Sequence, residues 1–187
     1  MLGYDYDGDE HRFNDAERND INLTRVIESR ILRINYTSYD IRREQDVLRP
    51  SQDCPIMALS REDDPTVAGH PYWYARVLRA FHIDVIHVGP NARCHSPQTM
   101  EVLWVRWLGV EPCYHWGFSR ARLPKVGFVP ESDENAFGFL DPSLVIRGCH
   151  LIPSFSDGRT SNLLRHGPFF SRGSDEVDDW TSFYVNM

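Results

Sequence analysis

Between residues 70 and 155, β-branched and aromatic residues form short runs, separated by segments rich in glycine, proline, asparagine and serine. Such runs are typical of the strands of a small antiparallel sheet or barrel. The clearest predicted strand covers 100–108, and the run over 72–88 is too long for one flat strand. The alternation of inward-facing and outward-facing side chains in this run is interrupted near 78–81, which predicts a β-bulge there. Shorter strands are predicted over 55–60, 124–129 and 147–152.

Short helical turns are predicted before these runs and within them. Between 23 and 34, apolar residues at helical spacing predict a short helical turn, which gives way to an alternating, strand-like stretch over 30–39. Residues 40–49 predict one or two further helical turns, with Asp40 as the cap and Pro50 forcing the end. Another helical turn is predicted after Asp141, which would cap it, with Pro142 at the first position.

The chain has 187 residues, of which 41% are hydrophobic and 12% aromatic, and this is enough for the core of one domain. We predict a mainly β protein of the β-rich α+β class, built as a distorted antiparallel barrel with short flanking helices. The expected parts are an acidic flexible arm over 1–22, a helical and strand lead-in over 23–54, the barrel over 55–155 and an irregular C-terminal extension over 156–187.

The net charge of −7 argues against attachment to nucleic acid through the whole surface. Basic residues concentrate in 73–125, however, which allows a local basic face. The four cysteines form no CxxC pair, the first residues do not resemble a secretion signal, and no apolar run approaches the ~20 residues that cross a bilayer. We therefore expect an intracellular protein with reduced thiols and no membrane partner.

Three of the strand-like stretches resemble the bromo-adjacent homology (BAH) domain, a distorted β-barrel of chromatin proteins. Residues 74–77 (Tyr-Ala-Arg-Val) are similar to that family's W-a-R-V strand, 103–107 (Leu-Trp-Val-Arg-Trp) to its v-x-W-f-x-R strand, and 144–151 to its closing I-x-G-k-C-x-V strand. The loop after Trp107 lacks the family's usual Arg-Pro, and the insert over 124–139 is unfamiliar. The resemblance implies a BAH-like or SH3-like barrel with a role in chromatin binding.

Four stretches are also similar to the C-terminal part of large transposon-encoded proteins of mushroom-type fungi, the Plavaka- or KDZ-like class. They cover 70–77, 103–107, 127–131 and 137–142. The DNA-cutting Asp/Glu core of those proteins lies upstream, and no residue of this chain maps onto it. The resemblance implies a non-enzymatic, nuclear accessory module that binds chromatin or DNA. The alternative is a truncated transposon fragment without a partner or activity.

Aromatic residues at predicted strand ends and in loops form a candidate ligand site. Rings arranged as a box beside an acidic group bind methylated ammonium through cation–π attraction, and such a cage would fit a histone tail. The candidate residues are Tyr72, Trp73, Tyr74, Trp104, Trp107 and Trp116, with Glu101 as the acidic group. The competing interpretation is that these rings simply form the core, as they do in many small β-domains.

Arginines interleave with these rings, as a surface that stacks bases and binds phosphates requires. The candidate nucleic-acid-binding residues, with DNA as the expected partner, are Arg76, Arg79, Arg93, Arg106, Arg120 and Arg122. The same alternation of arginine with apolar residues is also typical of any half-exposed strand.

Other chemistry has less support in the sequence. Three Cys/His pairs (Cys94-His95, Cys113-x-His115 and Cys149-His150) lack the repeated spacing of a zinc site, so no metal or cofactor is expected. A Cys/His or Asp/His hydrolase would need a nucleophile signature, which these residues lack. The apolar stretch over 180–184 predicts self-association through the C-terminal segment.

Overall fold

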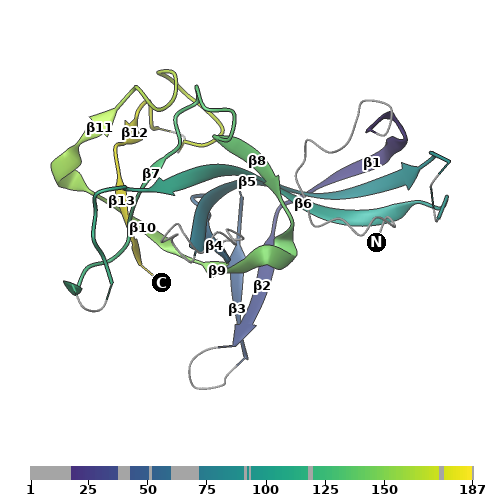
Figure 1. Cartoon of the computed structure of the whole chain (residues 1–187), viewed down its shortest axis with the longest axis horizontal. Coiled ribbons are helices and arrows are strands. Elements are labelled where there is room, and N and C mark those ends of the chain that lie inside the picture. The colour runs from purple at the N-terminus through teal and green to yellow at the C-terminus, as the bar shows by residue number, and fades with distance from the viewer. Residues whose placement is uncertain are drawn as a thin grey trace.

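The computed structural model describes residues 18–37, 43–50, 52–59, 72–90, 92, 94–117, 120–172 and 175–186. In these residues the protein is mainly β, as predicted (Figure 1). The strands are β1 (Ile21–Ser29), β2 (Leu32–Thr37), β3 (Arg43–Leu48), β4 (Pro55–Leu59), β5 (Tyr72–His87), β6 (Gln98–Val110), β7 (Lys125–Phe128), β8 (Phe137–Leu140), β9 (Val145–Gly148), β10 (His150–Pro153), β11 (Arg159–Thr160), β12 (Asp179–Trp180) and β13 (Phe183–Asn186). Two 3₁₀ turns, η3 (Pro142–Leu144) and η4 (Phe155–Asp157), join them.

The main sheet is antiparallel and bends into a nearly closed barrel, which confirms the predicted barrel fold. Its strand order is β10-β13-β7-β6-β5-β4-β9, and β1 and β8 pair with β5 and β6 outside this path. The strands β9 and β10 stand at opposite ends of this order, yet only Cys149 separates them in the chain. The continuous β9–β10 segment therefore closes the barrel.

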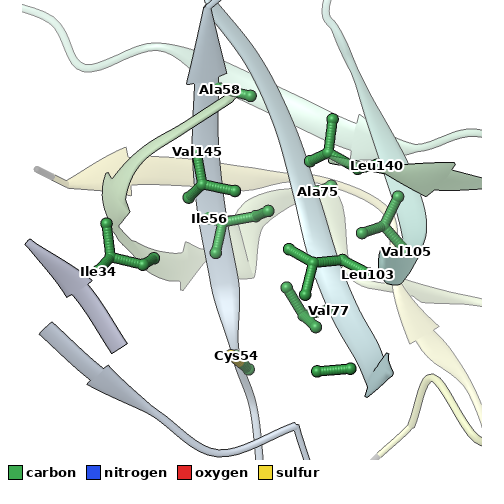
Figure 2. Packing of buried hydrophobic residues seen from close by; sticks show 11 residues of the cluster. Ile34, Cys54, Ile56, Ala58, Ala75, Val77, Leu103, Val105, Leu140 and Val145 are labelled. Atoms are coloured by element: carbon green, nitrogen blue, oxygen red, sulfur yellow. The ribbon is translucent and has the colours of Figure 1, made fainter. Parts of the chain in front are cut away.

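Each face of the sheet has its own core, because successive side chains of a strand point to opposite faces. The barrel interior contains Met57, Tyr74, Leu108, Val126, Phe128, Cys149, Phe183 and Val185. The opposite face of β4, β5 and β6 carries a second core, shown in Figure 2, which the β2–β3 hairpin, β8 and β9 cover. Both cores are made mainly of residues from the predicted β-rich runs.

Strands β1, β5 and β6 extend beyond the barrel as a three-stranded arm (Figure 1). The β5–β6 register shifts between Val77 and Arg79, so the bulge predicted near 78–81 is confirmed where β5 leaves the barrel. One face of the arm is apolar and open, with Leu23 64% exposed and Val26 and Met100 also exposed.

The helical turns predicted in the lead-in over 23–54 are wrong within the described residues. Residues 21–29 form β1, which pairs with β5, and residues 32–37 pair with 43–48 as the β2–β3 hairpin. Cross-strand hydrogen bonds and packing on the second core outweigh the helical spacing of the apolar residues. The predicted cap Asp40 lies outside the described residues.

The C-terminal segment, predicted to be irregular over 156–187, contains β11, β12 and β13. Strand β13 lies between β10 and β7 in the barrel wall, where Phe183 and Val185 are buried. These two side chains pack in the core, and the self-association predicted for 180–184 stays a prediction. The turn predicted at 141–144 is confirmed as η3, where the Asp141 carboxylate accepts a hydrogen bond from the Ser143 backbone N–H at 2.8 Å.

Candidate aromatic binding cleft

Two tryptophan rings meet at one end of the barrel wall. Trp107 of β6 lies opposite Ala75 of β5, so Trp73 is its diagonal neighbour on the same face. The two ring centroids are 5.7 Å apart and the ring planes meet at 79°. With Tyr72 they line a cleft of about 590 Å³, completed by residues 108–110, Val129 and Asn135. Because Trp73 is 37% exposed, a ligand can reach its ring.

Backbone contacts and a glycine hold Trp107 in place. Its N–H donates to the Ala136 carbonyl at 3.0 Å, and its carbonyl accepts from the Val129 N–H at 3.1 Å. A Cβ atom added to Gly138 would lie 2.8 Å from Trp107 Nε1, which is closer than real Cβ contacts. Strand β8 therefore needs glycine at this position so that the indole ring can lie against it.

The loop over 130–136 brings negative charge next to the cleft. Asn135, which lines the cleft, donates to Asp133 Oδ1 from its backbone N–H at 2.8 Å and from Nδ2 at 3.2 Å. Glu131 and Glu134 are exposed in the same loop. These acids were not predicted to be part of a site, although the acidic, turn-like composition of 131–135 is visible in the sequence.

The other predicted cage residues lie elsewhere. Tyr74 points into the barrel core and is only 1% exposed, and burial raises the pKa of its hydroxyl. The Trp104 ring packs against Phe137 and Phe170, at centroid distances of 6.3 and 6.2 Å. Glu101 pairs with His82 on the arm at 3.3 Å, and Trp116 lies in the loop between β6 and β7. The structure thus brings together Tyr72, Trp73 and Trp107 and separates the rest.

The predicted nucleic-acid-binding arginines do not form one face. Arg106 is fully buried and cannot contact a phosphate, and the Arg76 side chain is only 11% exposed at the barrel end. Arg79 pairs with Glu28 at 2.7 Å beside the arm. Arg120 and Arg122 are exposed in the loop between β6 and β7, and Arg93 lies outside the described residues.

Sequence reasoning missed a buried ion-pair network. Arg106 Nη1 donates to Asp179 Oδ1 at 2.9 Å and to Ser171 Oγ at 3.0 Å. Arg172 Nη2 donates to Asp179 Oδ2 at 2.9 Å, and the same guanidinium donates to the carbonyls of residues 164, 165 and 167. Burial lowers the pKa of Arg106, although its bonds to Asp179 oppose that effect. This network fastens residues 164–172 and 175–180 over one end of the barrel.

The four cysteines divide into two pairs by exposure. Cys54 and Cys149 are buried, and burial raises the pKa of each thiol to about 12. Cys94 and Cys113 are exposed, and a hydrogen bond from the Ser96 hydroxyl lowers the pKa of Cys94.

Because the thiolate is the reactive form, we expect Ellman's reagent to modify two thiols per native chain at pH 8 and all four after denaturation. Cys94→Ser should reduce the native count to one. Rapid modification of all four thiols in the native protein would contradict the burial of Cys54 and Cys149.

Comparison with known proteins finds no match to any protein-family model, curated protein or solved structure. Among the described residues, no group of three or more His, Cys, Asp or Glu side chains is arranged to hold a metal ion. In the same part of the chain, no helix has the length and apolar character needed to cross a membrane. A functional proposal therefore rests on the geometry of the cleft and on the sequence resemblances.

Proposed function

We propose that this protein is a non-enzymatic, chromatin-associated binding module that receives a methylated ammonium group of a histone tail in the cleft lined by Trp73 and Trp107. The observation that supports it is the pair of nearly perpendicular indole rings, 5.7 Å apart, on the wall of an accessible cleft. The rings meet edge to face, so a cation would lie beside the pair, in the cleft that both rings line, and gain cation–π attraction from their accessible π-surface.

The neighbouring charge favours the same ligand. Three acidic residues, Glu131, Asp133 and Glu134, occupy the loop that forms one side of the cleft, and Asp133 holds Asn135 in place there. Negative charge beside the rings raises the local concentration of a basic peptide and speeds its association. A histone tail is such a peptide, because it is rich in lysine and arginine.

The partner, the location and the accessory role in this proposal come from the two sequence resemblances. The resemblance to BAH domains supports a chromatin partner and a nuclear location, and the resemblance to fungal transposon proteins supports an accessory role beside a DNA-cutting core. DNA binding through the exposed arginines and a truncated fragment without a partner are the alternatives that an experiment must separate.

A histone-peptide array with matched unmodified and trimethylated lysine peptides tests the proposal. Trp73→Ala should weaken binding of the trimethylated peptide by about 30-fold, since a desolvated cation–π contact contributes about 2 kcal/mol. Binding of the unmodified peptide should change little. Trp73 is the ring to replace, because Trp107 also packs against the second core and its loss would disturb the fold.

Trp104→Ala is the matched control, since it removes a tryptophan from the same sheet outside the cleft. It should leave methyl-dependent binding unchanged. Equal losses in Trp73→Ala and Trp104→Ala would contradict the assigned cleft. Salt-dependent binding of a DNA duplex without peptide binding would favour the arginines instead, and no binding of either would favour the partnerless fragment.

A further inference from the structure

The β2–β3 hairpin turns one face to the protein and the other to solvent. Exposed side chains alternate with partly or fully buried ones along β2 and over 45–48 in β3. On the inner face Leu32, Ile34 and Leu48 pack against the second core. The two strands extend away from the barrel (Figure 1). Their outer face consists of six exposed side chains, three from each strand: Arg33, Asn35, Thr37, Arg43, Gln45 and Val47.

The charged side chains on this outer face are both positive. They are Arg33 of β2 and Arg43 of β3, and the other four side chains of the face are uncharged. The two acids of these strands, Glu44 and Asp46, belong to the inner face, where they accept hydrogen bonds at 3.0 and 2.8 Å. The outer face therefore attracts anions, although the chain as a whole has a net charge of −7.

Contacts on the inner face fix the orientation of the hairpin. The Asp46 carboxylate accepts a hydrogen bond from the Gly148 N–H at 2.8 Å, and the Arg147 guanidinium lies 4.7 Å from the centre of the Tyr36 ring. A Cβ atom added to Gly148 would lie 3.1 Å from Leu48 Cδ2, so β3 packs closely on β9. The outer face is thus presented on a firm support, which lowers the entropy lost when it binds a partner.

The polar groups of the outer face follow a fixed order along the hairpin. Asn35 and Gln45 are cross-strand partners, and Gln45 Nε2 donates to Asn35 Oδ1 at 2.8 Å. This bond still leaves the pair a donor in Asn35 Nδ2 and an acceptor in Gln45 Oε1. Arg33 and Arg43 come from different strands, one on each side of the amide pair. At about 3.3 Å per residue, they are separated by roughly 13 Å along the hairpin.

We propose that the outer face of the β2–β3 hairpin binds double-stranded DNA by entering its major groove. This groove is about 12 Å wide and admits a two-stranded β-ribbon. Arg33 and Arg43 bind phosphates on the two sides of the groove, and the Asn35–Gln45 pair faces the base edges, where adenine offers an acceptor and a donor. The proposed histone-tail binding does not require this face, because β5 and β6 carry the rings of the cleft.

Fluorescence anisotropy of a short labelled DNA duplex, titrated with the full chain at several salt concentrations, tests the proposal. Arg33→Gln and Arg43→Gln should each weaken binding about eightfold at about 0.1 M salt and lower the salt slope of log K by about 0.9, the value for one phosphate contact. An RNA duplex of the same sequence should bind more weakly, because side chains cannot read its deep, narrow major groove.

Arg120→Gln is the matched control, because this arginine is also exposed but lies in the loop between β6 and β7. It should bind DNA as the unaltered protein does, and so should Trp73→Ala. Arg33→Gln should keep methyl-dependent peptide binding, which separates the two sites. All three arginines are exposed, so their substitution should change stability by no more than about 0.5 kcal/mol in urea denaturation.

Four results would each overturn the proposal. They are absence of duplex binding, unchanged DNA affinity in both Arg33→Gln and Arg43→Gln, an equal loss in Arg120→Gln, and binding of duplex RNA as tightly as duplex DNA. The last result would show that the hairpin meets phosphates without entering the major groove.

Discussion

Replacing Asp179 with asparagine should destabilise the protein by about 3–5 kcal/mol, the largest effect we expect from a single polar substitution. Asp179 neutralises Arg106 and Arg172, and none of the three side chains is accessible to water beyond 2%. An asparagine would leave two guanidinium groups buried without a counter-charge. Urea denaturation of the two proteins, extrapolated to water, measures the loss.

Glu28→Gln is the matched control. It breaks an ion pair of similar length, Arg79–Glu28 at 2.7 Å, but at the surface, where such a pair contributes at most about 1 kcal/mol. Comparable losses in the two variants would show that the Asp179 network is not buried as described.

The Asp179 carboxyl should also make stability depend on acid pH. Burial by itself would raise its pKa, but hydrogen bonds from Arg106 and Arg172 outweigh burial and hold the pKa below its usual value of 3.8. The unfolded chain therefore binds the proton more readily than the native protein. The stabilisation is fully present well above pH 3.8 and is lost as the pH falls below that value through the lower native pKa. Accordingly, the difference in unfolding free energy between the unaltered protein and Asp179→Asn should shrink in acid.

Phe183→Ala should cost about 3–5 kcal/mol, which is the usual range for truncating a buried phenylalanine. The Phe183 ring is buried in the barrel interior, where it meets Phe128 edge to face at a centroid distance of 5.5 Å. Its removal leaves a cavity between β13 and β7, the two strands that pair through it and Val126. Thermal and urea unfolding would both report the loss.

Phe139→Ala provides the comparison, because that ring is 72% exposed and its removal should change stability by no more than about 0.5 kcal/mol. A small effect of Phe183→Ala would mean that β13 is not part of the barrel wall. In that case the C-terminal segment would be the irregular extension that the sequence predicts.

Local patterns predicted much of the fold correctly. Residue alternation and β-propensity located the strands at 55–60, 72–88 and 100–108, and the broken alternation near 78–81 located the bulge. Asp141 followed by Pro142 predicted the turn η3, because both the cap and the fixed backbone angle act within a few residues. The strands, the bulge and the turn depend on residues only a few positions apart in the chain, so the local sequence is enough to predict them.

Strand pairing over long distances was decided by tertiary structure alone. The stretch over 23–34 has helical spacing, yet β1 pairs with a strand about sixty residues away because the long β5 offers it a partner. Strand β13 has only four residues, too few for a periodic signal, and it is fixed by β10 and β7 on its two sides.

The candidate sites divide in the same way. The aromatic and arginine-rich strands were evident in the sequence. Which of their side chains share a face depends on how the strands pair in the sheet. Trp104 and Trp107 are three residues apart in one strand, so they point to opposite faces, and only Trp107 reaches the cleft. Arg106 looked like a surface cation because its counter-charge, Asp179, lies 73 residues away. The sequence by itself determined that this chain forms an aromatic, arginine-rich β-barrel. Only the tertiary structure decided which of those side chains line the cleft and which pair with Asp179 in the core, because both depend on residues far apart in the chain.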